Sequence, residues 1–193
     1  EIYKSGIRNF IGRKKDKFDV ILINLPPPSS LGLNRFYTKE FFELLKSHCK
    51  KETVICTSLP STANYAEENA LDVNSSLWKT LNCSFEYCLL IPGEKNYFLV
   101  SDTPLSHFIT EKITEKNILT EYVNEYYIND KLLLQRSESL ISRFTDSVPV
   151  NRDFHPYMFS KQIIHWLSFF GGGFRILVVV PAILFFAMFF MTT

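Results

Sequence analysis

The stretch Asp19-Val-Ile-Leu-Ile-Asn-Leu25 decides the fold, because it is a nearly continuous apolar run that opens on an acidic residue and is followed by three prolines. Such runs are typical of parallel strands that are buried on both faces. A second run of this kind, Thr53-Val-Ile-Cys-Thr-Ser-Leu59, lies further along the chain. With a helix between them, the two runs predict a right-handed βαβ unit, and therefore an α/β fold with Asn24 at the end of a central strand.

The residues between these runs have the periodicity of an amphipathic helix. Thr38 is a suitable N-cap for a helix that continues to about Cys49, and apolar side chains recur along one stripe of it. After the second strand, a further helix is expected over about residues 66–81. Both helices fit the spacing of alternating strands and helices in an α/β sheet.

The pattern then changes to two strands with a short connection. Residues 85–91 and 97–101 are apolar, and only Pro92-Gly-Glu-Lys-Asn96 separates them. This gap is too short for a helical crossover, so the two strands are expected to be antiparallel. A parallel sheet that finishes in an antiparallel hairpin looks like the end of a nucleoside-binding, methyltransferase-type Rossmann sheet. Helices near 105–117 and 129–143 are expected to follow.

The charge and the cysteines of the chain limit which partners, metal sites and compartments we expect. The chain has 193 residues and a formal net charge of +1, so no nucleic-acid partner is expected. The four cysteines form no CxxC pair, and the histidines do not cluster with them. We therefore expect free thiols in a reducing compartment and no metal site. The cysteines are Cys49, Cys56, Cys83 and Cys88.

The end of the chain has the composition of a membrane segment. From Ile176 to Thr193 it carries no charge and is almost wholly apolar, which predicts a transmembrane helix with the lipid bilayer as partner. Trp166 and Arg175 suit the membrane interface, and a buried core helix is the alternative. We assign residues 1–150 to an α/β domain, 151–157 to a linker, and 158–193 to a membrane-associated and transmembrane segment. The absence of an initial methionine and the end within an apolar run indicate a fragment of a longer protein.

Two blocks of sequence resemble a known family. Residues 17–24 and 34–42 look like the second half of a spermidine synthase (polyamine aminopropyltransferase) domain. The stretch 24–30, followed by 33–37, is similar to the membrane-fused spermidine synthase-like proteins of bacteria. Val150-Asn-Arg-Asp153 with Pro156 resembles an element near the end of the synthase domain. The resemblance covers roughly residues 2–157, and it implies a partial Rossmann domain whose N-terminal half is missing.

The resemblance implies a co-substrate and a set of site residues. Proteins of this family bind decarboxylated S-adenosylmethionine and transfer its aminopropyl group to a diamine. Their two acidic positions in the loop after the strand fall on Asn24, as the catalytic position, and on Pro27, as a substrate-binding position. Tyr37 matches a pocket position. The pair that contacts the adenine end of the cofactor falls on Gly6 and Ile7.

Simpler structural roles remain open for the same residues. Asn24 suits a strand-end turn, the prolines around Pro27 suit a stiff loop, and Tyr37 suits a packing staple before a helix. Arg8 is expected at the surface. His155 and His165 are expected to pack or to anchor at the membrane boundary rather than to act in catalysis.

The changed acidic positions predict a change of function. An amine with a pKa near 10 must lose a proton before it attacks, and an asparagine cannot take that proton. One hypothesis is therefore a membrane-tethered transferase whose ordinary activity is lost. The alternative is a non-catalytic nucleoside- or polyamine-sensing domain that regulates a membrane transport region. In both cases we expect the protein to lie in the inner or plasma membrane of a bacterium, with its soluble domain facing the cytoplasm. We also expect that it can form a homo-oligomer.

Overall fold

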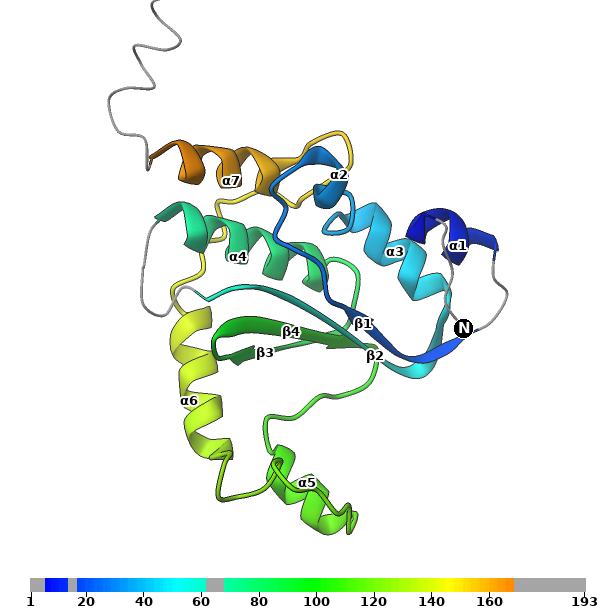
Figure 1. Ribbon diagram of the computed structural model, residues 1–193, viewed down its shortest axis with the longest axis vertical. Helices are drawn as coiled ribbons and strands as arrows, with labels where there is room; N and C mark the ends of the chain where they lie inside the picture. Colours follow the sequence, from blue (N-terminus) through cyan, green and yellow to red (C-terminus); the bar gives the residue numbers. More distant parts are fainter. Residues whose placement is uncertain (1–5, 14–16, 62–67, 169–193) are drawn as a thin grey trace, which may run out of the picture.

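A computed structural model describes residues 6–13, 17–61 and 68–168 of the chain, and the side chains of residues 68 and 165–168 are not described. Within these ranges the chain forms a mixed four-stranded sheet with helices on both sides (Figure 1). The elements are α1 (Ile7–Arg13), β1 (Phe18–Ile23), α2 (Leu31–Asn34), α3 (Lys39–Ser47), β2 (Cys49–Pro60), α4 (Glu68–Asn82), β3 (Tyr87–Pro92), β4 (Lys95–Ser101), α5 (Ile109–Glu115), α6 (Asp130–Ile141) and α7 (Tyr157–Ser168).

The predicted βαβ unit is confirmed. β1 and β2 are parallel, with a register that runs from Val20 opposite Val54 to Ile23 opposite Thr57, and α3 lies between them in the chain. Thr38 stands at the N-cap of α3 as expected, but its hydroxyl makes no capping hydrogen bond. That hydroxyl is used in a longer-range contact, described below.

The predicted hairpin is also confirmed. β3 and β4 are antiparallel, and β4 inserts between β2 and β3, so that the strand order is β1-β2-β4-β3. The turn is tighter than the sequence indicated, because β3 extends to Pro92 and β4 begins at Lys95. This arrangement brings the start of β4 to the same edge of the sheet as the end of β2.

One expectation about β1 is wrong. The run 19–25 was expected to form a central strand buried on both faces, but in the described sheet β1 is an edge strand and one of its faces is open. Val20 and Leu22 are 59% and 74% exposed, whereas Ile21 and Ile23 pack against the core. The reason is that successive side chains of a strand point to opposite faces, and the described helices cover only one face at this edge.

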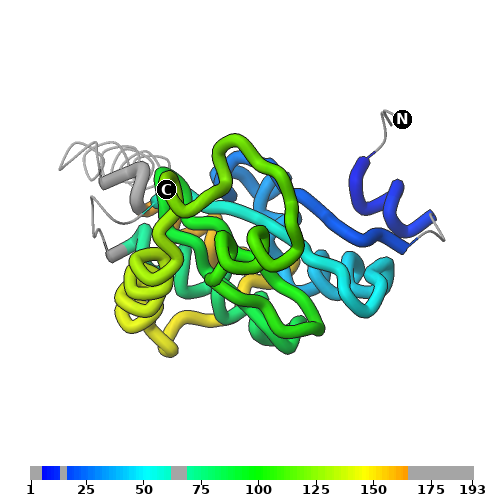
Figure 2. The backbone as a smooth tube through the Cα atoms, turned by 90° about the horizontal axis from the view of Figure 1, so that it is seen from below, coloured from blue at the N-terminus to red at the C-terminus, as the bar shows by residue number. Residues whose placement is uncertain are grey.

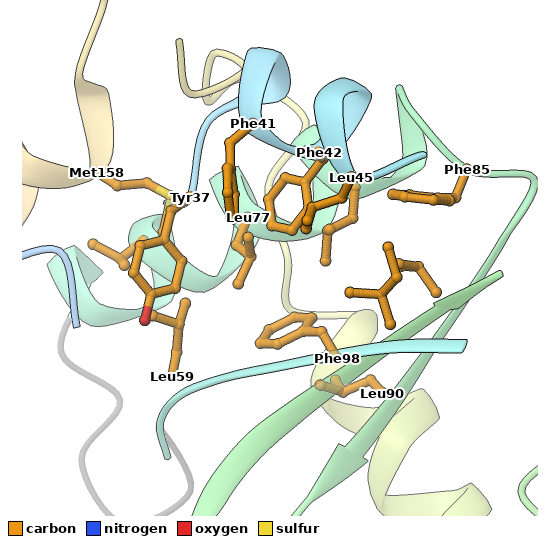
Figure 3. Packing of buried hydrophobic residues seen from close by; sticks show 14 of the residues in the cluster. Tyr37, Phe41, Phe42, Leu45, Leu59, Leu77, Phe85, Leu90, Phe98 and Met158 are labelled. Carbon is orange, nitrogen blue, oxygen red and sulfur yellow. The ribbon is translucent and has the colours of Figure 1, made fainter. Parts of the chain in front are cut away.

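The hydrophobic core lies between the sheet and the layer of α3, α4 and α7 (Figure 3). Its fully buried aromatic side chains come from the helical layer and from the middle of β4, and Met158 joins them from α7. Burial of a side chain of this size stabilises the fold by about 1.5–3 kcal/mol. The large, fully buried members of the core include Tyr37, Phe41, Phe42, Leu77, Phe98 and Met158.

The segment after the hairpin supplies two more helices, near the predicted positions. α6 packs against β3, and seen from below the segment with α5 runs across the lower side of the molecule (Figure 2). α1 and α6 lie at opposite ends of the molecule in both views. The fold is thus a mixed α/β sheet of the expected kind.

The C-terminal region is described only in part. α7 packs along α4, where Lys161 forms an ion pair with Asp72 at 2.7 Å and the Tyr157 hydroxyl also bonds this carboxylate, at 3.3 Å. No helix within the described ranges is long and apolar enough to cross a bilayer. The predicted transmembrane run Ile176–Thr193 lies outside the described residues, as does Arg175, and so the domain limits at 150 and 157 stay predictions.

Candidate functional site

A pocket of about 300 Å³ lies at the end of the sheet where β1 and β2 finish and β4 begins. Residues 24–27 after β1, residues 58–60 at the end of β2, and Lys95 at the start of β4 line it. Ligands of open α/β sheets bind outside the carboxyl ends of the strands, so this position is the expected one for a site. A larger cavity, of about 710 Å³, lies between the hairpin turn and α6.

The structure places the predicted site residues in three different situations. Asn24 and Pro27 line the pocket. Tyr37 is fully buried and is not among the lining residues, and Gly6 and Ile7 are exposed at the start of α1. The structure therefore brings Asn24 and Pro27 together, while the assigned roles of all five residues stay predictions.

Tyr37 instead holds the loop that forms one wall of the pocket. Its hydroxyl donates to the carbonyl oxygens of Leu25, at 3.2 Å, and Pro26, at 2.8 Å. Burial disfavours the charged phenolate and raises the pKa of Tyr37 to about 12. The neutral hydroxyl is thus a fixed donor that sets the path of the backbone after β1.

The turn before Tyr37 is also fixed by local hydrogen bonds. Ser30 caps α2, where its hydroxyl oxygen accepts from the backbone N–H of Leu33 at 3.1 Å. Asn34 is buried, and its side-chain oxygen accepts from the amide of Asn151 at 3.1 Å. The same Asn151 amide donates to the carbonyl of Tyr37 at 3.0 Å, so a residue far along the chain supports the loop.

Arg8, expected at the surface, takes part in a second network. Its guanidinium donates two hydrogen bonds to Asp153, at 2.6 and 2.8 Å, and one to the Thr38 hydroxyl at 2.8 Å. Thr38 in turn donates to Asp153 at 2.8 Å, and Arg8 also donates to the carbonyl of Arg35. The surface expectation is wrong because the partner carboxylate lies 145 residues away in the sequence.

The ionisation of Asp153 reflects this network. Partial burial opposes its negative charge, but the hydrogen bonds from Arg8 and Thr38 outweigh that effect, so the pKa of the Asp153 carboxyl lies below its ordinary value. The pair is largely shielded, with side chains 19% and 22% exposed. We refer to Arg8, Thr38 and Asp153 as the Arg8–Asp153 clamp.

The four cysteines are free thiols in the structure, and Cys83 is the exposed one. Burial raises the pKa of the Cys88 and Cys56 thiols, so neither is an activated nucleophile. No cluster of three metal-ligating side chains occurs among the described residues.

Sequence reasoning did not single out Lys95. Among the described residues that line the pocket, it is the only charged one. The signal that could have placed it there is the predicted hairpin, because an antiparallel strand begins at the edge where its neighbour ends.

Comparison with known proteins supports one family. No family model matches the chain. A polyamine aminopropyltransferase of Oceanobacillus iheyensis is 38% identical over 61 residues, which are 32% of this chain and 12% of that protein. Polyamine aminopropyltransferase 2 of Aquifex aeolicus is 25% identical over 126 residues, 64% of this chain and 24% of that protein. The chain thus spans at most about a quarter of these curated relatives.

A solved structure agrees with the fold. The crystal structure of a spermidine synthase in complex with the transition state analogue AdoDATO aligns with a TM-score of 0.52 and 16% sequence identity, over 71% of this chain and 48% of that one. At this identity the likeness concerns the fold alone. The two sequence matches show that the matched part of the chain is homologous to polyamine aminopropyltransferases.

Proposed function

We propose that the protein is a membrane-tethered, spermidine synthase-like protein that binds a nucleoside derived from S-adenosylmethionine and lacks ordinary aminopropyl transfer to putrescine. One observation carries the proposal. The pocket at the carboxyl ends of β1 and β2 is lined by Asn24 and Pro27, which the sequence resemblance matches to the two acidic positions of the family, and no carboxylate belongs to its described lining.

The chemistry of the acceptor explains why this matters. Putrescine is a cation in neutral water, and its amine attacks only after it loses a proton. A positioned general base contributes roughly a hundred- to ten-thousand-fold to the rate of such a step. The amide of Asn24 accepts a hydrogen bond but not a proton, and Pro27 offers no side-chain acceptor at all. Binding and activation of the amine are therefore both weakened.

The same observation favours a binding role as the second candidate function. A pocket whose described lining offers an amide, a hydroxyl and an ammonium but no carboxylate base is suited to recognition rather than to proton transfer. In this reading the domain senses a nucleoside or a polyamine and regulates the membrane segment that the sequence predicts after residue 158.

Two measurements on the purified full-length protein test the proposal. Calorimetry with S-adenosylmethionine and with its decarboxylated form measures nucleoside binding, and an assay with decarboxylated S-adenosylmethionine and putrescine measures aminopropyl transfer. We expect binding of a nucleoside and turnover at least about a hundred-fold below that of an ordinary synthase. Ordinary turnover would contradict the loss of activity, and absence of binding would contradict the nucleoside site.

Two variants test whether the missing carboxylates are the cause of weak putrescine binding. Asn24→Asp combined with Pro27→Asp restores two carboxylates to the pocket wall, and we expect putrescine to bind more tightly. Ser29→Asp adds a carboxylate to the same loop outside the pocket lining and is the control. Equal putrescine affinity in both variants would show that the diamine site lies elsewhere.

A further inference from the structure

We propose that the pocket beside Asn24 binds the carboxylate of its ligand through Lys95, so that intact S-adenosylmethionine binds in preference to the decarboxylated form. The inference rests on the proposed function in one respect, namely that a nucleoside site exists at this edge of the sheet. It adds the chemical class of the group that enters the pocket, an anion rather than an amine cation.

The sheet register brings Lys95 to the pocket. Lys95 is the first residue of β4 and lies opposite Pro60, the last residue of β2. Two residues further into the sheet, Tyr97 lies opposite Ser58. Because side chains two positions apart share a face of a strand, Lys95 and Ser58 belong to the same face of the sheet.

The parallel pair adds the third polar group. Ile23 lies opposite Thr57, so Asn24 is level with Ser58 at the end of β1. Lys95, Ser58 and Asn24 are all lining residues of the pocket. Three neighbouring strands thus contribute an ammonium, a hydroxyl and an amide to one pocket.

No neighbour in the described part of the chain neutralises the charge of Lys95. Its side chain is exposed, and none of the ion pairs formed within the described ranges includes it. By contrast, Lys46 is held by Asp102 at 2.8 Å and Lys161 by Asp72 at 2.7 Å. The Lys95 ammonium is therefore available to a ligand.

A carboxylate suits these donors better than an amine does. It accepts charge-assisted hydrogen bonds from an ammonium, and it also accepts from amide and hydroxyl groups. A cationic amine would meet like charge at Lys95, with no carboxylate in the described lining to offset the repulsion. S-Adenosylmethionine and its decarboxylated form differ only in this carboxylate, so their relative affinity reports the preference of the pocket.

The experiment is calorimetric titration of the full-length protein with each nucleoside in turn. We expect intact S-adenosylmethionine to bind about ten-fold more tightly, a difference of about 1.4 kcal/mol. Lys95→Gln should make the two affinities equal, and Lys95→Arg, which keeps the charge, should retain most of the preference. Lys112→Gln removes an exposed lysine on α5 outside the pocket and should leave the ratio unchanged.

The ratio of two affinities measured on the same sample does not depend on the fraction of folded protein, so a partly unfolded variant still gives a valid result. Equal or tighter binding of the decarboxylated nucleoside by the unaltered protein would overturn the inference while the proposed function stands. An unchanged ratio in Lys95→Gln would do the same. Failure of both nucleosides to bind would overturn the proposed function, and the inference with it.

Discussion

The Arg8–Asp153 clamp makes a quantitative prediction about stability. Asp153→Asn removes the negative charge while it keeps the size of the side chain and one acceptor oxygen. The carboxylate accepts three hydrogen bonds, two from Arg8 and one from Thr38, at 2.6 to 2.8 Å. Hydrogen bonds to charged groups contribute about 1.5–3 kcal/mol each, but part of that survives in the amide. Because the pair is about one-fifth exposed, we expect a loss of about 2 kcal/mol in the free energy of unfolding.

A matched control separates the clamp from an ordinary ion pair. Asp19 contacts Lys50 at 2.8 Å, but its side chain is 77% exposed. Exposed pairs contribute about 0–1 kcal/mol, so Asp19→Asn should change stability little. Urea unfolding monitored by circular dichroism measures both variants. A loss in Asp153→Asn that is no larger than the loss in Asp19→Asn would refute the reasoning.

The pH dependence follows from the lowered pKa of Asp153. A carboxyl whose folded-state pKa is depressed stabilises the fold above its unfolded pKa, about 3.9, and this stabilisation is lost as the pH falls through the folded-state pKa. The difference in the free energy of unfolding between the unaltered protein and Asp153→Asn should therefore reach its full value at pH 7 and should shrink in strongly acidic solution. A difference that stayed constant to pH 2 would show that the charge is not its cause.

Three further predictions concern Tyr37, the last described helix and the compartment. Tyr37→Phe should lower the free energy of unfolding by about 1 kcal/mol, since it removes the hydrogen bonds to two loop carbonyls. Because the pKa of Tyr37 is raised to about 12 in the folded protein, the unaltered protein should lose stability between about pH 10 and 12, and the variant should not show this loss. Unfolding curves measured at neutral and alkaline pH test both effects. A chain that ends at residue 153 should be less stable than one that ends at 168, because it lacks the fully buried Met158, whose removal costs about 2–5 kcal/mol; thermal melts of the two would contradict this if their midpoints coincided. If the domain faces the cytoplasm, the exposed Cys83 should resist a membrane-impermeant thiol reagent in intact cells and react after lysis, and labelling in intact cells would argue for the opposite orientation.

The parts of the fold that depend on local pattern could be predicted from the sequence. The βαβ unit and the hairpin follow from apolar runs and from the length of one connection, and both are present. The burial of β1 could not be predicted, because exposure of Val20 and Leu22 depends on which elements cover each face of the sheet. The contact of Arg8 with Asp153 joins the two ends of the described chain, and no periodicity marks such a pair.

In the candidate site, too, some residues could be predicted from the sequence and others depended on the arrangement of the strands. Asn24 was placed by its position after a strand, Pro27 was assigned through the resemblance to the family, and both line the pocket. Lys95 required the strand order, because only the insertion of β4 beside β2 brings its first residue to this edge. The residue that gives the pocket its charge was therefore the one that sequence pattern alone did not indicate.

The clamp and the pocket are linked through two adjacent residues. Thr38 bonds Asp153, while Tyr37 bonds the carbonyls of the loop that carries Asn24, and Asn151 holds the carbonyl of Tyr37. A shift of the segment 151–153 should therefore move Tyr37 and Thr38 together, because Asn151 contacts the first and Asp153 the second. Asp153→Asn should for this reason weaken nucleoside binding as well as stability, whereas Asp19→Asn should alter neither. Unchanged affinity in a destabilised Asp153→Asn protein would show that the loop is held by Tyr37 and Asn151 without help from the clamp.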